Sequence, residues 1–441
     1  MRGWEVGELR SVKMKPILQV ALDFVDLPRA LKVAEEAVAG GADWLEVGTP
    51  LIKSEGLNAV RALRKRFPQK IILADMKTID AGRTEVETAL KAGANIVHVL
   101  AAASDSTIKE CLEAADNYGG EIIADLIEVK EVVQRAKELE GLGVHYIGVH
   151  TAIDVQMEGG SPFKELKEVS RAVKVPLAVA GGINSETAAQ AIKNGAIIVI
   201  VGGAITKSAD AKLATRKIKE AIDKRVKIKT ELYKRVSVSH IRGILEKVST
   251  ANISDAMHRQ GELRTVYPIT LGVKMVGTAL TVRTYPGDWA KTVEAIDLAK
   301  SGDVIVVDAG GVGPAVWGEL ATHSCLQKGI KGIVIDGAIR DTPEIKALRF
   351  PAFARIATPT AGEPKGFGEI GVAVEIGGVK IHPGDWVVGD DDGVVIIPKE
   401  KVVEFANRAM DVLEKENRLR KEIQEGSTLS QVAYLEKWEK K

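Results

Sequence analysis

Ionisable side chains gather at the end of one strongly apolar segment of this chain. Residues 71–74 are all apolar and predict a buried strand, and Asp75, Lys77 and Asp80 follow directly. If the strand geometry continues, side chains two residues apart leave the same face, so Asp75 and Lys77 should lie together. Acids and amines are seldom buried unpaired. This group is therefore either a structural ion pair or a site for a metal ion and an anionic substrate.

Four other predicted strands end in residues that serve acid–base or metal chemistry, namely Asp23, Glu46, Asp125 and His150. Taken singly, Asp23 would be as well explained as a helix cap and His150 as a hydrogen-bonding residue. Groups at the ends of five strands are harder to explain in that way. They indicate one site shared by several strands.

Glycine pairs follow the last two predicted strands, Gly181 with Gly182 and Gly202 with Gly203. Each pair leads into a predicted helix, so backbone N–H groups can approach an anion at the helix N-terminus. One pair alone would indicate only a tight turn. Two pairs at these two strands favour a phosphate-binding site.

These residue types suit chemistry on a sugar phosphate. The carboxylates of Glu46 and Asp75 are ligands for Mg²⁺, with Mn²⁺ as an alternative. A divalent ion on adjacent oxygens of a ketose phosphate stabilises the enediolate charge that develops when a proton leaves carbon. His150 titrates near neutrality and could move protons.

The elements that position these residues alternate regularly along the first half of the chain. Continuous apolar strands alternating with amphipathic helices predict a parallel sheet covered by helices. Eight such units favour a (β/α)₈ barrel over an open doubly wound sheet, and a barrel places its active site at the strand ends. The predicted strands are 17–23, 44–48, 71–75, 95–101, 121–127, 146–150, 176–182 and 197–203.

Composition limits the function classes. The 441 residues indicate two or three domains, and 61 basic against 60 acidic residues give no surface for nucleic acid. The longest apolar run, residues 196–205, is much shorter than the ~20 residues of a membrane helix. The N-terminus lacks a secretion signal, and the two cysteines lack metal or disulfide spacing, so we expect a cytoplasmic protein with no membrane partner.

The segment DMKTID resembles the DxKxxD signature of the orotidine 5′-monophosphate decarboxylase suprafamily. With ALD, EVGTP, ADLI, VHTAID, AGGIN and VGGAI, the region from Met14 to Lys227 resembles the 3-hexulose-6-phosphate synthase family. The resemblance implies magnesium-dependent aldol addition of formaldehyde to ribulose 5-phosphate, and the reverse cleavage. It also implies that Glu46 and Asp75 hold magnesium, that Asp23, Lys77 and Asp125 surround the enediolate, and that Asp80 reaches the neighbouring subunit's site in a homodimer.

The alternative within this suprafamily is 3-keto-L-gulonate 6-phosphate decarboxylase, which shares the metal ligands. That family carries a glutamate where this chain has Asp125, and arginines where it has Ile153 and Ala204. The metal-free nucleotide decarboxylase has no need of Glu46. His98 departs from the synthase pattern, which has a smaller polar residue there, and its expected role is structural.

In the second half of the chain the predicted strands cluster, with fewer helices between them. We expect the barrel at residues 1–228, a charged helical linker at 229–235 that continues the eighth helix, and an α+β domain of β/β/α type at 236–441. Residues 249–257 predict a helix capped by Asn252 or Ser254. Strands are expected at 273–284, 304–310, 332–339 and 350–357, with a hairpin at 379–398 and a charged C-terminal helix.

A second candidate site follows the strand 332–339. Arg340 offers a planar fork for a carboxylate, and Asp341 could help to hold a metal, although the two could equally form a surface pair. With Glu319 and Glu344 they resemble the E-x20-R-D-x2-E pattern of the family that contains the regulator of ribonuclease activity A and 4-hydroxy-4-methyl-2-oxoglutarate aldolase. The resemblance covers about Val236 to Val412 and implies a 2-oxo acid on the arginine, a second Mg²⁺ near Asp341, or a noncatalytic binding module. It also implies trimers or larger rings, which would assemble barrel dimers into larger oligomers.

Overall fold

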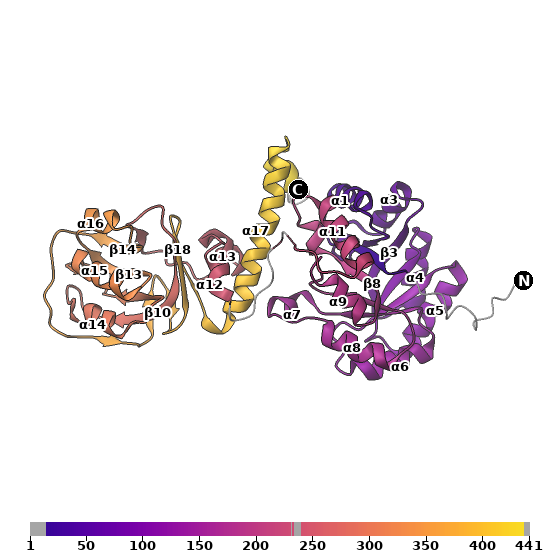
Figure 1. The fold of residues 1–441 in the computed structure, drawn as a ribbon, viewed down its shortest axis with the longest axis horizontal. Coiled ribbons are helices and arrows are strands. Elements are labelled where there is room, and N and C mark those ends of the chain that lie inside the picture. The colour runs from indigo at the N-terminus through magenta and orange to yellow at the C-terminus, as the bar shows by residue number, and fades with distance from the viewer. Residues whose placement is uncertain (1–14, 231, 233–239, 436–441) are drawn as a thin grey trace, which may run out of the picture. The chain divides into compact units, whose positions relative to one another are not determined.

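The computed structural model describes residues 15–230, 232 and 240–435 (Figure 1). The chain divides into two compact units. The first comprises residues 1–156, 160–233 and 414–441, and the second comprises residues 157–159 and 234–413. Each unit is described by itself below.

The first unit contains a closed barrel of eight parallel strands in sequential order. This confirms the predicted (β/α)₈ fold and rules out the open sheet. The strands are β1 (Ile17–Leu22), β2 (Trp44–Val47), β3 (Ile71–Thr78), β4 (Ile96–Leu100), β5 (Glu121–Asp125), β6 (Tyr146–His150), β7 (Leu177–Ala180) and β8 (Ala196–Val201).

Helices surround the barrel, and most of them turn apolar residues towards the strands (Figure 1). In the first helix the side chain of Asp26 caps the N-terminus by accepting from the Arg29 amide, and Gly41 ends the helix in the left-handed conformation. The helices are α1 (Leu27–Gly40), α2 (Thr49–Glu55), α3 (Asn58–Arg66), α4 (Gly82–Lys91), α5 (Asp105–Tyr118), α6 (Val132–Leu142), α7 (Ile153–Met157), α8 (Phe163–Ala172), α9 (Ala188–Lys193), α10 (Gly203–Thr206) and α11 (Ala211–Lys224).

The strands bury residues on both faces, because alternate side chains point to opposite sides of the sheet. One face packs against the helices, and the other forms a separate core that includes Leu73, Ile96, Ile123 and Ile198. This inner core fills the barrel below the polar residues at the strand ends.

The eighth helix ends earlier than the sequence suggested. Helix α11 stops at Lys224 because Arg225 adopts the left-handed conformation, with φ of 55°. Residues 226–230 have no regular secondary structure, so the expected helical continuation is wrong there. Residues 231 and 233–235 of the predicted linker lie outside the described residues, and the predicted domain boundaries stay a prediction.

The second unit is built on a mixed sheet with the order β19-β18-β10-β11-β13-β14-β9. Four central strands run parallel with helices between them, and antiparallel strands extend the sheet on either side. A bridge between Glu262 and Val395 nearly closes the sheet. The strands are β9 (Tyr267–Pro268), β10 (Met275–Arg283), β11 (Asp303–Asp308), β12 (Ala315–Trp317), β13 (Gly332–Ile339), β14 (Ala352–Ala357), β15 (Glu369–Ile370), β16 (Val374–Ile376), β17 (Val379–Ile381), β18 (Trp386–Asp390) and β19 (Gly393–Ile397).

The helices of the second half include the predicted helix at residues 249–257, with one correction. Its N-cap is Ser249, not Asn252 or Ser254, because Ser249 and Asn252 form a reciprocal capping box. The helices are α12 (Ile241–Leu245), α13 (Thr250–Ala256), α14 (Ala290–Leu298), α15 (Glu319–Lys328), α16 (Thr342–Ala347), α17 (Val402–Gln424) and α18 (Leu429–Val432).

The C-terminal residues 414–441 belong to the barrel unit although they follow the second domain in sequence. Arg418 of α17 is 2% exposed and donates to both carboxylate oxygens of Glu36 in α1 and to the carbonyl of Ser208. Its Nε also donates to Glu422. These charge-assisted hydrogen bonds attach the end of the chain to the barrel.

Candidate functional site

The inward-facing positions of the barrel strands carry the site. Asp75 continues the inner row of Leu73 in β3, and His98 continues that of Ile96 in β4. The strand register places Asp75 opposite His98. Because all eight strands are parallel, such residues converge at the carboxyl end of the barrel.

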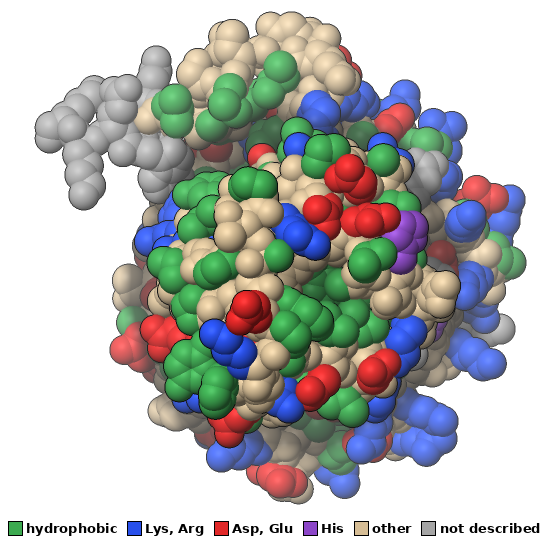
Figure 2. Space-filling model, turned by 90° about the vertical axis from the view of Figure 1, so that its left-hand side faces the viewer, with side chains coloured by type: hydrophobic (Ala, Val, Ile, Leu, Met, Phe, Trp, Pro, Cys, Tyr) green, Lys and Arg blue, Asp and Glu red, His purple; other side chains and the backbone are tan. Residues whose placement is uncertain are grey.

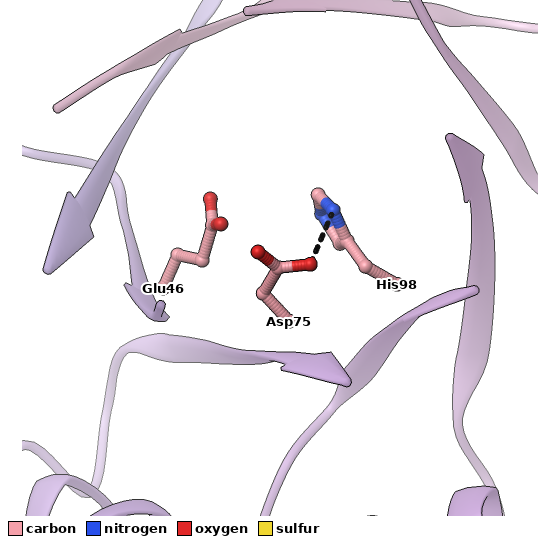
Figure 3. Close-up of side chains that lie close together, drawn as sticks. All are labelled: Glu46, Asp75 and His98. Carbon is pink, nitrogen blue, oxygen red and sulfur yellow. Dashed lines mark ion pairs between the residues drawn. The ribbon is translucent and has the colours of Figure 1, made fainter. Parts of the chain in front are cut away.

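Glu46, Asp75 and His98 form a buried cluster whose side chains point towards one another (Figure 3). Each is 4% exposed, and each offers a ligand atom within 4.8 Å of the others. Within residues 15–230, 232 and 240–435, no other such group of three His, Cys, Asp or Glu residues occurs. The predicted magnesium ligands are thus brought together, with a histidine beside them.

The hydrogen bonds of Asp75 leave one oxygen for a further partner. Its Oδ2 accepts from Thr49 Oγ1 at 2.7 Å and from Lys77 Nζ at 2.7 Å. Its Oδ1 is buried and accepts no hydrogen bond. A buried carboxylate oxygen without a donor is costly, and a cation satisfies it. The donor set therefore fits a divalent metal ion.

Glu46 is the acid most affected by this crowding. Burial raises the pKa of its carboxyl well above the usual value, and the negative charges of Asp75 and Asp23 raise it further. The one hydrogen bond from Gln19 Nε2, at 2.5 Å, acts in the opposite direction. Ionised Glu46 beside Asp75 thus requires a compensating positive charge.

Lys77 reaches the site through an irregular backbone. The strand register shifts between Asp75 and Thr78, and Lys77 has a left-handed φ of 49°. Strand β3 continues to Thr78 as expected, but with a bulge at Lys77, and the expected meeting of the two side chains occurs. Burial lowers the pKa of Lys77, but Asp75 and Asp125 outweigh it and raise the pKa overall. Lys77 is therefore a cation held between two acids.

Asp125 and His150 form a second polar pair at the mouth. His150 Nδ1 lies 2.8 Å from Asp125 Oδ2, and Lys77 Nζ lies 3.9 Å from the same oxygen. Burial lowers the pKa of His150, but the negative charge of Asp125 outweighs it and raises the pKa. Burial raises the pKa of the Asp125 carboxyl, but the charge of His150 and the hydrogen bond to it lower this pKa by more, so the pKa is lowered overall. The imidazole therefore keeps its proton at a higher pH than free histidine.

Asp23 lies next to the predicted phosphate glycines. A Cβ on Gly202 would lie 3.2 Å from Asp23 Oδ2, and a Cβ on Gly203 would lie 3.2 Å from Lys207 Nζ. Protein atoms crowd the carboxylate, although part of the residue remains exposed, and this crowding and Asp75 raise the pKa of Asp23.

The other glycine pair has a constrained backbone. Gly181 and Gly182 have φ of 111° and 68°, a region that other residues rarely adopt. A Cβ on Gly181 would lie 2.9 Å from the carbonyl oxygen of Thr151. At Gly181, Gly202 and Gly203 neighbouring protein atoms thus stand close to where a Cβ would lie, so a larger residue at these positions would crowd its neighbours.

Asp80 does not join the cluster within one chain. It is exposed and follows Ile79, which is 49% exposed. Its predicted role in a neighbouring subunit therefore stays a prediction.

Sequence reasoning missed four residues of this site: Gln19, Thr49, His98 and Lys207. Gln19 and His98 are fully or nearly fully buried and lie below the strand ends. A signal was available, because each is a polar residue at an inward position of an otherwise apolar strand. The structural role expected for His98 does not account for its place in the carboxylate cluster.

The candidate site of the second unit is more open. Arg340 Nε lies 3.5 Å from Asp341 Oδ2, which also accepts from the Glu319 amide at 3.1 Å. His323 Nε2 lies 3.2 Å from Glu319 Oε1. A Cβ on Gly318 would lie 2.5 Å from Asp341 Oδ2, so only glycine allows this approach. The predicted Glu319, Arg340 and Asp341 are thus brought together at the surface.

No helix among the described residues is long and apolar enough to cross a membrane.

Comparisons with known proteins divide the chain at the same two halves. Residues 16–218 match the model of the orotidine 5′-phosphate decarboxylase/HUMPS family, and residues 250–396 match the RraA-like (Aldolase/RraA) family. The 3-hexulose-6-phosphate synthase of Bacillus subtilis (strain 168) is 44% identical over 206 residues, which are 46% of this chain and 98% of that protein.

Two solved structures cover the same half. A 3-hexulose-6-phosphate synthase from Salmonella typhimurium is 37% identical, with a TM-score of 0.46, over 47% of this chain and 99% of that chain. A 3-keto-L-gulonate-6-phosphate decarboxylase from Vibrio cholerae O1 biovar El Tor str. N16961 is 31% identical, with a TM-score of 0.44. The match covers 48% of this chain and 98% of that chain.

Proposed function

Because the chain belongs to the orotidine 5′-phosphate decarboxylase/HUMPS family in its first half and to the RraA-like family in its second, we propose that it is a two-domain lyase. Its barrel adds formaldehyde to ribulose 5-phosphate, giving 3-hexulose 6-phosphate, and catalyses the reverse cleavage. One observation carries this proposal: the buried carboxylates of Glu46 and Asp75, the latter with one oxygen that has no hydrogen-bond donor, lie close together beside Lys77 in a barrel that resembles named synthases.

The reaction requires a divalent metal ion, Mg²⁺ or Mn²⁺, held by Glu46 and Asp75. When bound, such an ion supplies positive charge where negative charge develops on the substrate oxygens. The fit rests on Asp75 Oδ1, which has no hydrogen-bond donor, and on the raised pKa of Glu46.

The remaining charged residues hold the substrate and its protons. The reaction removes a proton from a substrate carbon, adds that carbon to formaldehyde, and delivers a proton to the new hydroxyl oxygen. Lys77, fixed between Asp75 and Asp125, presents a cation to the substrate anion. His150, oriented by Asp125, holds a proton at its ring and exchanges it with the substrate. Asp23 lies at the same mouth and positions the substrate hydroxyls.

The phosphate lies against the backbone of Gly181, Gly182, Gly202 and Gly203, where side chains would obstruct it. Lys207 adds a positive charge there, since its ammonium lies beside the Cβ position of Gly203. Asp80 completes the site of a second barrel in a homodimer.

The alternative reaction is decarboxylation of a 3-keto-gulonate 6-phosphate. The identity of 31% to the decarboxylase of Vibrio cholerae keeps this alternative open. Asp125 favours the aldol reaction, because the decarboxylase resemblance requires a glutamate at that position. Ile153 and Ala204 likewise stand where that family has arginines.

The metal assignment is tested with matched substitutions at the two ends of the barrel. The chelator-treated full chain should consume formaldehyde only when ribulose 5-phosphate and MgCl₂ or MnCl₂ are both present. Asp75→Asn should reduce this rate by roughly 100-fold or more, since it removes a metal ligand. Asp43→Asn is the control, because Asp43 precedes β2 and bonds Leu18 and Lys219. Unaltered activity in Asp75→Asn contradicts the metal assignment.

For the second domain we propose that Arg340 binds the carboxylate of a 2-oxo acid and that Asp341 helps to hold a second Mg²⁺. Two observations support this proposal. Arg340 and Asp341 pair where solvent reaches both side chains, and Gly318 has no Cβ that would collide with Asp341 Oδ2. Turnover of oxaloacetate should be lost in Arg340→Ala and retained in Arg264→Ala, whose side chain is 71% exposed. No turnover across a broad panel of 2-oxo acids would favour a noncatalytic binding module.

An assembly role for the second domain has its own support. Hydrophobic side chains are exposed on this domain among acidic and basic ones (Figure 2). Tyr285, Leu298, Leu320 and Phe367 are 64%, 64%, 77% and 57% exposed. Such residues favour association of chains into larger oligomers. Leu320→Glu in the full chain should then lower the mass measured by light scattering, and an unchanged mass would argue against assembly through Leu320.

A further inference from the structure

We propose that His98 is a third metal ligand and that the barrel site therefore prefers a first-row transition-metal ion to Mg²⁺. This deepens the proposed function, because it names the class of metal at the same site. The aldol reaction itself is not needed for the binding to occur.

The position of His98 supports this role. It is 4% exposed, it occupies an inward position of β4, and the strand register places it opposite Asp75. Its Nδ1 lies 3.8 Å from Asp75 Oδ1, which is too long for a hydrogen bond. Two atoms that bind one metal at about 2.1 Å are themselves about 3 to 4 Å apart. The separation thus matches two ligands of one ion.

The oxygen that faces His98 is the unpartnered one. Thr49 and Lys77 both bond Asp75 Oδ2, which leaves Oδ1 buried without a donor. If His98 had only a structural role, its ring would be expected to donate to this oxygen within hydrogen-bond distance. Instead the nitrogen and the oxygen stand apart, with Glu46 as the third member of the cluster (Figure 3).

The surroundings of His98 allow either ring nitrogen to be unprotonated. Its Nε2 lies 3.4 Å from Gln19 Nε2, and Gln19 Oε1 has no hydrogen-bond partner. The amide of Gln19 donates to Nε2, and after a half-turn of the amide its oxygen accepts from Nε2–H. The half-turn frees Nδ1 as a ligand, but it also turns the Gln19 oxygen towards Glu46 Oε2, which lies 2.5 Å from the amide nitrogen, so it requires a metal ion that draws the Glu46 carboxylate away.

A nitrogen ligand changes the preference of the site. Mg²⁺ favours oxygen ligands, whereas imidazole suits Mn²⁺, Fe²⁺, Co²⁺ and Zn²⁺, whose affinities for such sites also rise along the first row. Two carboxylates and one imidazole should therefore bind Co²⁺ or Mn²⁺ more tightly than Mg²⁺. Two carboxylates without the imidazole should lose this advantage.

The test uses chelator-treated full chain and His98→Gln, which keeps an amide hydrogen-bonding group but removes the nitrogen ligand. Calorimetric titration should show tighter binding of CoCl₂ than of MgCl₂ to the wild type. His98→Gln should weaken Co²⁺ binding by roughly 100-fold or more, above the 10- to 100-fold that loss of an outer partner costs, and should change Mg²⁺ binding much less. Equal losses for both ions, or no loss, would overturn the proposal.

A spectroscopic measurement gives a second readout that needs no activity. In the Mn²⁺-loaded wild type, electron spin echo modulation should detect a directly bound ¹⁴N nucleus, and the signal should disappear in His98→Gln. His323→Gln is the matched control, because His323 lies beside Glu319 at the other candidate metal site. A ¹⁴N signal that persists both in His98→Gln and in the double variant His98→Gln/His323→Gln contradicts the proposal. The condensation rate with ribulose 5-phosphate, measured separately, tests the proposed reaction and not this ligand.

Discussion

Glu46→Gln should stabilise the metal-free chain and destabilise the metal-loaded chain relative to wild type. In the metal-free chain Glu46 is fully enclosed, is repelled by Asp75 and Asp23, and has one hydrogen-bond donor. Glutamine keeps an oxygen that accepts from Gln19 but carries no charge. Above the raised pKa of Glu46, where its carboxylate is ionised, removing this buried charge should raise the free energy of unfolding by about 1 to 3 kcal/mol.

The metal reverses this order. A ligand at 100 times its dissociation constant stabilises the folded state by about 2.7 kcal/mol, and the wild type gains this while Glu46→Gln gains little. For a unit of this size each kcal/mol shifts the midpoint temperature by about 2 to 4 °C. In scanning calorimetry without metal, the midpoint temperature of the barrel should be several degrees higher in Glu46→Gln than in the wild type. With metal present, the midpoint of Glu46→Gln should lie below that of the wild type.

The pH dependence follows from the raised pKa of Glu46. Because the pKa of Glu46 in the folded chain lies above the ordinary glutamate value of the unfolded chain, the folded metal-free chain retains a proton that the unfolded chain has released. The stability from this group is present at low pH and is lost as the pH rises through the folded pKa. Glu121→Gln, at the start of β5 beside Tyr146, is the control and should not respond to metal. If Glu46→Gln lowers the midpoint in both states, the carboxylate is not an uncompensated charge and the reasoning fails.

Three other substitutions test separate parts of the molecule. Asp125→Asn should lower the pKa of His150, because Asp125 is what raises it; NMR titration of the imidazole should show deprotonation at a lower pH, and an unchanged value would refute the pairing. Gly181→Ala should destabilise the barrel by about 1 to 3 kcal/mol and raise KM for the phosphate substrate, because the alanine Cβ would lie 2.9 Å from the Thr151 carbonyl oxygen. A KM equal to that of the wild type would count against a phosphate-binding role of this loop. Arg418→Met should cost about 3 kcal/mol in denaturant unfolding, because it leaves two glutamates without their buried partner, and a neutral result would show that the C-terminal helix does not stabilise the barrel.

Much of the barrel could be predicted because its signals are local. Continuous apolar strands alternating with amphipathic helices identify the parallel sheet, and its closure then brings residues at different strand ends together. Asp75, Glu46, Asp125 and His150 met for this reason. The same rule missed His98, because it considered only strand ends and not the inward row beneath them.

Other features depend on contacts that the sequence does not display. The left-handed conformations of Lys77 and Arg225 occur without a glycine, so neither the irregular end of β3 nor the early end of α11 had a local signal. The attachment of Arg418 to Glu36 joins residues far apart in sequence. Such pairings become visible only once the fold is known.

The central claim is that the barrel makes and cleaves a carbon–carbon bond to formaldehyde. The most direct measurement compares kcat/KM of the metal-loaded chain for formaldehyde with ribulose 5-phosphate against that for release of CO₂ from 3-keto-L-gulonate 6-phosphate. We expect the aldol reaction to exceed decarboxylation by at least about 100-fold, which corresponds to about 2.7 kcal/mol of transition-state preference. Release of CO₂ at the higher rate, without consumption of formaldehyde, would contradict the account.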